Sequence, residues 1–147
     1  MGSNYKGTIE EVRVLNTYIK LQRATDSVNA RINSFLSKSG LTESQFFMLD
    51  ALFHLGPLSQ KELGNKLLKS GGNITMVVDN LEERKLVKRK RSKKDRRLIY
   101  VHLTEKGEKK IKEYLPGVVD TLMKEMKIIS TEDQETLQRL CKKIGFS

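Results

Sequence analysis

The chain has 147 residues, of which 37% are hydrophobic and 31% charged, so it is long and apolar enough to fold around its own core rather than stay disordered. Its formal net charge of +10 favours a polyanionic partner. There is no apolar run of the roughly 18 residues that cross a bilayer, no secretory signal and one cysteine, so we expect a cytoplasmic protein without membrane spans or internal disulfides.

The first predicted element is a long amphipathic helix over residues 9–36, because apolar residues recur there mostly at steps of three and four. It is expected to end near Ser39-Gly40, where Gly can adopt a left-handed cap. Two shorter helices then begin at capping boxes, residues 42–45 and 59–62. A third helix begins after Ser70-Gly71-Gly72. A short helix, a tight turn and a further helix in direct succession have helix-turn-helix spacing.

The apolar period then changes to that of a β-hairpin. Ile99, Val101 and Leu103 alternate with their neighbours, residues 87–91 can form the opposing strand, and the polar residues 92–95 suit the tip. A two-stranded hairpin is marginal in water, so it is expected to lean on the preceding helices as the wing of a winged helix.

Two helices complete the chain. Thr104 is predicted to cap a long helix, which Pro116 should kink or divide because proline lacks the N–H that a helix needs. Thr131 is predicted to open the last helix through a third capping box.

The predicted fold is mainly α, a single domain over residues 1–147. A winged helix-turn-helix with a two-stranded β wing spans residues 41–104. The flanking segments 1–40 and 105–147 hold more apolar face than so small a wing domain can cover. We therefore expect them to be dimerisation helices that bury this face against a partner chain.

The positive charge is concentrated in the winged-helix region. Residues 59–104 carry a net charge of +8, whereas residues 1–58 and 105–147 carry +1 each. Within residues 88–97, eight of ten side chains are Lys or Arg. Clustered cations bind duplex DNA by releasing counterions from its phosphates, although a solvated charged hairpin is the alternative interpretation. The predicted wing contacts to DNA are Arg89, Arg91, Lys93, Lys94, Asp95, Arg96 and Arg97.

Two smaller patterns suit DNA recognition. Asp95 and Arg97 share one face of a strand, so the carboxylate can orient the guanidinium as a minor-groove probe; an exposed ion pair of little consequence is the alternative. The third helix begins with small residues, which let a helix end approach DNA closely, although residues 70–73 can equally be a simple cap. The predicted contacts of this helix are Ser70, Gly71, Gly72, Asn73, Thr75 and Met76.

No residue pattern indicates catalysis. His54 and His102 are isolated, and no His, Cys or carboxylate group has metal-ligand spacing. There is neither a phosphate-binding Gly-rich loop nor a nucleophile with an evident His partner. We therefore predict no enzymatic activity, no cofactor and no metal. Cys141 lies on an apolar helix face and is expected to serve packing.

Four motifs together resemble those of the MarR family of transcriptional regulators. They are the run from Asn73 to Glu82, Leu86-Val87-Lys88-Arg89, the wing signature Asp95-Arg96-Arg97, and Leu103-Thr104-Glu105-Lys106-Gly107. The likeness extends over nearly the whole chain. It implies a homodimer on a pseudo-palindromic DNA operator, usually a repressor that a small molecule or an oxidant releases. In the family pattern Arg97 matches the wing arginine, Asp95 its partner, and residues 70–76 the start of the reading helix.

The resemblance also bears on regulation. Residues 69–75 resemble members that respond to quinones and phenols, which implies an effector of that class. Its predicted pocket is lined by Tyr18, Phe47, Phe53 and His54. Lys85 departs from the pattern, because the family usually has Gly there, and this predicts a different exit from the reading helix. An RNA-binding or a protein-interaction winged-helix module remains the alternative to a DNA-binding regulator.

Overall fold

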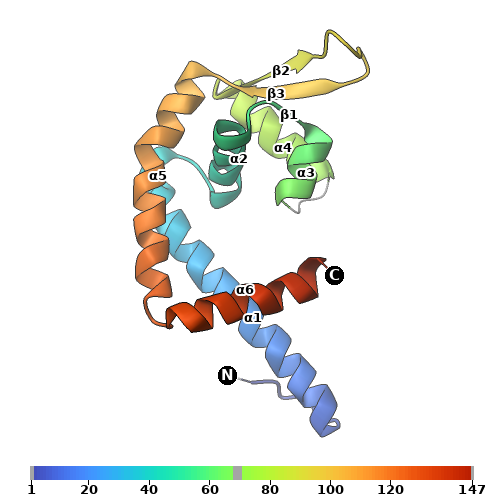
Figure 1. The fold of residues 1–147 in the computed structure, drawn as a ribbon, viewed down its shortest axis with the longest axis vertical. Coiled ribbons are helices and arrows are strands. Elements are labelled where there is room, and N and C mark those ends of the chain that lie inside the picture. Colours follow the sequence, from blue (N-terminus) through green and yellow to red (C-terminus); the bar gives the residue numbers. More distant parts are fainter. Residues whose placement is uncertain (1, 68–70, 147) are drawn as a thin grey trace. The chain divides into compact units, whose positions relative to one another are not determined.

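The computed structural model describes residues 2–67 and 71–146, and it divides into two compact units. The central unit is Asn33–Val118, and the terminal unit combines Met1–Ile32 with Val119–Ser147. Helices dominate the described residues, and a small antiparallel sheet lies in the central unit (Figure 1). The mainly helical fold class predicted from the sequence is confirmed. Among the described residues, no helix combines the length and the apolar character needed to span a membrane.

The first three helices begin and end at local signals. Helix α1 (Ile9–Leu36) continues into one 3₁₀ turn and stops at Gly40, whose φ is 72°. Helix α2 (Glu43–Leu55) has the predicted capping box: the Thr42 hydroxyl accepts the Gln45 N–H, and the Gln45 side chain accepts the Thr42 N–H. The same reciprocal bonds join Ser59 and Glu62 at the start of helix α3 (Gln60–Leu67).

Helix α4 (Gly71–Glu83) ends in a left-handed residue although that residue is not glycine. Lys85 has a φ of 61°. Its N–H donates to the Glu82 carbonyl and the Leu86 N–H donates to the Leu81 carbonyl, both at 2.9 Å. These two bonds form a Schellman motif, and Leu81 and Leu86, at the two positions that usually hold apolar residues in this motif, are both buried. The expectation that Lys85 changes the exit of this helix is therefore wrong, because Lys85 itself adopts the conformation that Gly would supply.

The wing hairpin lies where the sequence predicts it, and a third strand joins it. Strands β2 (Val87–Arg91) and β3 (Ile99–Leu103) pair antiparallel, with Arg89 opposite Val101. The two-residue strand β1 (Leu58–Ser59) pairs with the other edge of β3, which gives the order β1-β3-β2. The sequence signals at Leu58 and Ser59 indicate only a helix start, so β1 was not predicted.

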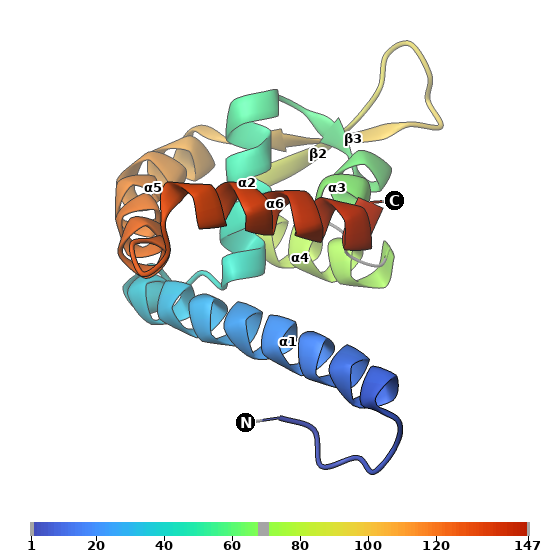
Figure 2. The ribbon, with the colours of Figure 1, turned by 60° about the horizontal axis from the view of Figure 1, so that its bottom comes forward.

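The core of the central unit joins this sheet to helices α2, α3 and α4. Helix α4 packs against α2, α3 and β2 (Figure 2). The side chains between them exclude water almost completely, so the reading helix and the wing rest on one common core. The buried apolar side chains of this region are Leu41, Phe46, Met48, Leu49, Leu52, Leu63, Ile74, Val78, Leu81, Leu86, Val87 and Val101.

Helix α5 (Glu105–Met126) begins as predicted, because the Thr104 hydroxyl accepts the Gly107 N–H at 3.0 Å. Pro116 lies inside α5 without dividing it, contrary to one of the two expected outcomes.

Helix α6 (Thr131–Phe146) corrects another expectation: its N-cap is Ser130, whose hydroxyl accepts the Asp133 N–H at 3.0 Å. The Gln134 side chain donates to the Met126 carbonyl instead of closing a capping box with Thr131.

Candidate nucleic-acid interface

The reading helix α4 has one buried and one exposed side. Ile74 and Val78 are fully buried on the inner side. Asn73, Thr75 and Met76 are exposed, and 71% of Met76 is accessible. Gly71 and Gly72 belong to the first turn of α4. Ser70, also predicted to contact DNA, lies outside the described residues. Helix α4 therefore presents short polar and flexible apolar side chains to the outside.

The wing tip is held by hydrogen bonds of its own main chain. The strand pairing ends at Arg91 opposite Ile99, and the Ser92 N–H donates to the Leu98 carbonyl at 2.8 Å. The Ser92 hydroxyl accepts the N–H groups of residues 94 and 95, and the Arg91 guanidinium donates to the Arg96 carbonyl. The tip extends beyond the helices of the central unit (Figures 1 and 2). Its exposed cations are Arg91, Lys93, Lys94, Arg96 and Arg97.

Asp95 and Arg97 form a two-pronged ion pair at this tip. Nε and one terminal nitrogen of Arg97 lie 3.1 Å from the two carboxylate oxygens, and the Arg97 N–H also donates to Asp95. The hydrogen bonds from the Arg97 side chain, and next those from its main chain, lower the pKa of Asp95 below its usual range. Because 89% of the Arg97 side chain is accessible, the pair orients a guanidinium that stays open to a ligand.

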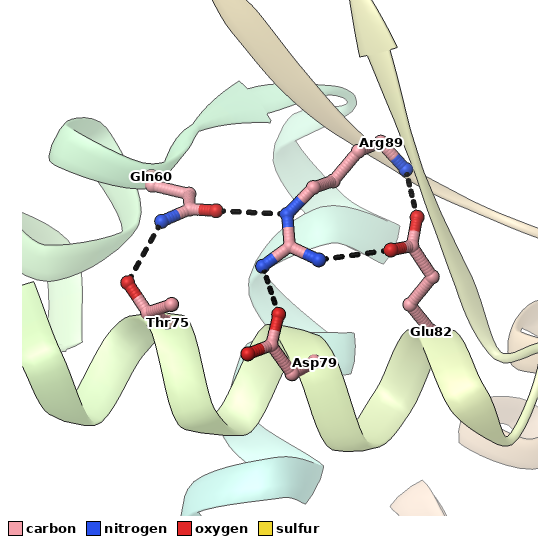
Figure 3. Close-up of polar contacts among 5 residues, drawn as sticks. All are labelled: Gln60, Thr75, Asp79, Glu82 and Arg89. Atoms are coloured by element: carbon pink, nitrogen blue, oxygen red, sulfur yellow. Dashed lines mark hydrogen bonds and ion pairs between the residues drawn. The ribbon is translucent and has the colours of Figure 1, made fainter.

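Arg89 differs from the other cations of the predicted wing set, because its guanidinium points into the protein (Figure 3). It donates to Gln60 at 2.9 Å, to Glu82 at 2.8 Å and to Asp79 at 2.6 Å, and only 22% of its side chain is accessible. Its main-chain N–H donates to the second oxygen of Glu82. The structure thus directs Arg89 towards α3 and α4, and not outward with the cations of the tip.

Electrostatics reinforce this arrangement. Burial lowers the pKa of Arg89, but hydrogen bonds and attraction from Asp79 and Glu82 outweigh burial and raise it. The main-chain hydrogen bond from Arg89 is the largest cause of the lowered pKa of Glu82. Both shifts favour the charged forms of Arg89 and Glu82 at neutral pH.

Sequence reasoning missed Gln60, Asp79 and Glu82 as partners of the wing. A signal for the inward direction of Arg89 was nonetheless present. Val87 begins the strand as a core residue, and side chains two positions apart share a face. Arg89 therefore shares the core face, whereas its neighbours Lys88 and Lys90 lie on the other.

The four residues predicted to line an effector pocket fall into different parts of the molecule. Tyr18 lies on α1 in the terminal unit, and 58% of it is accessible. Phe47, Phe53 and His54 lie on α2 in the central unit, where the rings of Phe53 and His54 pack edge to face at 5.0 Å. His54 also lies 3.0 Å from the Asp50 carboxylate. The effector pocket stays a prediction.

Residues 2–67 and 71–146 contain no group of three or more His, Cys, Asp or Glu side chains arranged to hold a metal ion. Cys141 is half-buried on α6.

Comparison with known proteins agrees with this geometry. The family model for the transcriptional regulator SarA/Rot matches residues 30–114. The HTH-type transcriptional regulator MhqR of Bacillus subtilis is 33% identical over 133 residues, which cover 90% of this chain and 92% of MhqR. The HTH-type transcriptional repressor MdtR of the same organism is 27% identical over 115 residues, or 78% of this chain and 74% of MdtR.

The fold is also that of a regulator solved on DNA. Sco3205, a MarR family transcriptional regulator from Streptomyces coelicolor in complex with DNA, has a TM-score of 0.84 and 18% identity, over 97% of this chain and 90% of that one. The family match covers more than half of the chain, and MhqR is related over nearly its full length. The chain shares its fold with MarR family regulators such as Sco3205. By its family model and its relatives, it belongs to the SarA/Rot family of transcriptional regulators and is a DNA-binding regulator, not an enzyme.

Proposed function

We propose that this chain acts as a homodimer on a pseudo-palindromic operator in duplex DNA, and that it represses transcription until a small phenolic or quinone effector releases it. One observation carries the DNA-binding part of the proposal. The exposed side of α4 and the cationic wing tip with its Asp95–Arg97 pair belong to the same compact unit.

The two elements suit different parts of a duplex. Asn73, Thr75 and Met76 have the size and chemistry to contact base edges and thymine methyl groups in the major groove. Lys93, Lys94 and Arg96 are exposed on the tip, where they can neutralise phosphates. The oriented guanidinium of Arg97 suits the minor groove, where a cation meets strong negative potential. The proposed contacts on α4 and the wing are Gly71, Gly72, Asn73, Thr75, Met76, Arg91, Lys93, Lys94, Asp95, Arg96 and Arg97, and Ser70, outside the described residues, completes the set.

Exposed apolar side chains on the terminal unit support a homodimer. Ile9, Ile128 and Ile144 are 80%, 82% and 66% accessible. Exposing several large apolar side chains of one unit to water is unfavourable and is typical of an interaction surface. A second copy would cover them, in line with the predicted role of segments 1–40 and 105–147. A two-fold dimer places its reading helices about 34 Å apart, one turn of DNA.

Repression and release rest on likeness to relatives. MdtR, by its name, is a transcriptional repressor. Residues 69–75 resemble regulators that respond to quinones and phenols, and the aromatic rings of Tyr18, Phe47 and Phe53 are suited to bind such ligands. Adding phenols and quinones to the preformed DNA complex tests this part: release by one of them supports it, and an unchanged affinity with every member of the series contradicts it.

The decisive experiment is selection of operator sequences from a random duplex library, followed by titration of the selected duplex at two salt concentrations. Scrambled duplex and double-stranded RNA serve as competitors. We expect saturation at two chains per site, strong salt dependence, and little competition from either. Equal competition by scrambled DNA would contradict sequence-specific recognition. Preferential binding of the RNA would instead favour an RNA-binding module.

A further inference from the structure

We propose that Arg89 is a positioning residue that determines base specificity without touching DNA, an inference that rests on the proposed function. The Arg89 cluster consists of Arg89 on β2, Gln60 on α3, and Thr75, Asp79 and Glu82 on α4 (Figure 3). It connects the wing to both helices of the helix-turn-helix.

The guanidinium of Arg89 is already engaged by the protein. Nε and both terminal nitrogens each donate to a different partner, at 2.9, 2.8 and 2.6 Å. A guanidinium has donors only, and its fork is planar, so these partners fix the direction of the group. To bind a phosphate, Arg89 would have to leave Asp79 and Glu82 unpaired. Phosphate binding by Arg89 would therefore cost more free energy than phosphate binding by an exposed Lys, which has no such partners to give up.

Arg89 also determines which way the Gln60 amide faces. The amide oxygen must accept the Nε–H of Arg89, because a guanidinium accepts no hydrogen bond. The amide nitrogen of Gln60 is thereby turned towards the Thr75 hydroxyl, 3.2 Å away. The conformation of Thr75, one of the proposed base contacts, is therefore held through Gln60 by a residue of the wing.

The second consequence concerns charge on the reading helix. Asp79 and Glu82 lie one turn apart on α4, and 60% of the Asp79 side chain is accessible. Unpaired, these carboxylates would repel nearby DNA phosphates. Arg89 pairs with both carboxylates and offsets one of their two negative charges.

The cluster also fixes the edge of the sheet. Strand β2 is at the edge, and the main-chain N–H of Arg89 donates to Glu82 at 2.8 Å. Glu82 thus accepts hydrogen bonds from both the main chain and the side chain of Arg89. The angle between the wing and the reading helix depends on these two bonds, because β2 is the strand of the hairpin that packs against α4.

Three variants test the proposal against direct phosphate contact. Arg89→Lys keeps the charge but not the fork, and Arg89→Met removes both. Gln60→Met breaks the link to Thr75 without changing any charge. Each is compared with wild type in operator selection and in titrations of operator and scrambled duplex over a range of salt. Urea unfolding verifies that each variant is folded.

We expect both Arg89 variants to lower the ratio of operator to scrambled affinity at least tenfold. Arg89→Lys should leave the salt slope on scrambled DNA unchanged. We also expect Arg89→Lys and Gln60→Met to lose discrimination at the same base positions as Thr75→Ala, since all three act on one side chain.

If Arg89 instead neutralises a phosphate, Arg89→Met reduces the salt slope by about 0.9 per chain, roughly 1.8 per dimer, and operator and scrambled affinities fall together. That outcome overturns the proposal. An unchanged selection profile for Gln60→Met also overturns it, and this second test remains valid even if Arg89→Met does not fold. Failure of the wild-type chain to select any sequence contradicts the proposed function itself.

Discussion

Lys85 shows how one residue can hold an unfavourable conformation because its surroundings require it. Its φ of 61° lies in the left-handed region, which costs a residue with a side chain about 1–2 kcal/mol. The two hydrogen bonds of the Schellman motif and the burial of Leu81 and Leu86 offset that cost. The chain thus leaves the reading helix towards β2 at the usual angle with an unusual residue.

Replacing Lys85 by Gly should stabilise the protein. The left-handed strain disappears, while glycine loses more entropy on folding, so we expect a net gain of about 0.5–1 kcal/mol. Urea unfolding measures it as a higher midpoint with an unchanged slope. Lys85→Ala is the matched control, because alanine removes the charge but keeps the strain. Equal stability of the Gly and Ala variants would show that no strain is stored there.

The exposed, oriented guanidinium of Arg97 is expected to contribute directly to operator affinity. Arg97→Ala should weaken operator binding by about 1–3 kcal/mol, the usual contribution of a good groove contact. Lys38→Ala, on the 3₁₀ turn after α1, serves as the control for general loss of positive charge. Equal effects of the two substitutions would remove Arg97 from the interface.

The same pair has a defined pH dependence. The pKa of Asp95 is lowered because Arg97 binds its charged form, so the contribution of the pair is present above the usual aspartate range. It is lost only as the pH falls through the lowered value. Between pH 5 and 8, protonation of Asp95 should therefore not change the operator affinity of the wild-type chain. The substitution Asp95→Asn should weaken operator binding throughout this range. A wild-type affinity that follows Asp95 titration near pH 5 would contradict the assignment.

At the scale of elements, three segments meet at the Leu86 carbonyl. The N–H and the hydroxyl of Thr104 donate to it at 3.1 and 3.0 Å, so the end of β3 and the start of α5 attach to the exit of α4. A Cβ built on Gly107 would lie 2.1 Å from the same carbonyl oxygen. The spacing Thr104-x-x-Gly107 therefore has a physical reason: the first residue caps the helix and the second leaves room for the main chain.

Gly107→Ala should destabilise the protein by about 1–3 kcal/mol or more, because main chain cannot move as a flexible side chain does. Gly145→Ala is the control within another helix, since a Cβ there meets nothing within 4 Å. That control should be stabilising by about 0.5–1 kcal/mol. Thermal or urea unfolding distinguishes the two, and a neutral Gly107→Ala would show that α5 can shift away from Leu86.

Elements with local signals could be predicted, and those without could not. Thr42 and Ser59 specify helix starts through residues three positions on, so both boundaries follow from the sequence. Ser130 and Thr131 are adjacent hydroxyl residues, and local pattern alone does not decide which one caps α6. Strand β1 depends on pairing with residues about forty positions later, and no neighbouring residue announces it.

The candidate site follows the same division. The sequence places Asp95 and Arg97 two positions apart, and the structure brings their side chains together. Arg89 stands in a run of similar cations, where residue type does not distinguish an inward from an outward side chain. Its partner Gln60 lies 29 positions earlier in the chain, so only the folded core brings the two together.

Across the whole molecule, charge and apolar surface occupy different units. The cations of the wing belong to the central unit, whereas large exposed apolar side chains concentrate in the terminal unit. In the proposed function, this separation assigns DNA binding to the central unit and binding of a second copy to the terminal unit.

Ile144→Glu tests that separation. A carboxylate placed in an apolar interface is costly to bury, so we expect the dimer to dissociate and the mass in sedimentation to fall towards the 16.9 kDa of one chain. Operator affinity should fall at least tenfold as one half-site is lost, while urea stability of the central unit stays the same. Gln138→Glu introduces the same charge at a polar position of α6 and should remain dimeric. If both variants remain dimeric, the surface around Ile144 is not the interface.

The closure of the wing ladder at Arg91 and Ile99 has a consequence for how such proteins diverge. The Ser92–Leu98 hydrogen bond completes the pairing, so the five residues between them hold no part of the sheet register. Insertions, deletions or exchanges there leave both strands in place. After gene duplication, two copies of this chain could therefore acquire tips of different length and charge while their reading helices recognise the same sequence. Grafting tips between relatives would exploit the same freedom.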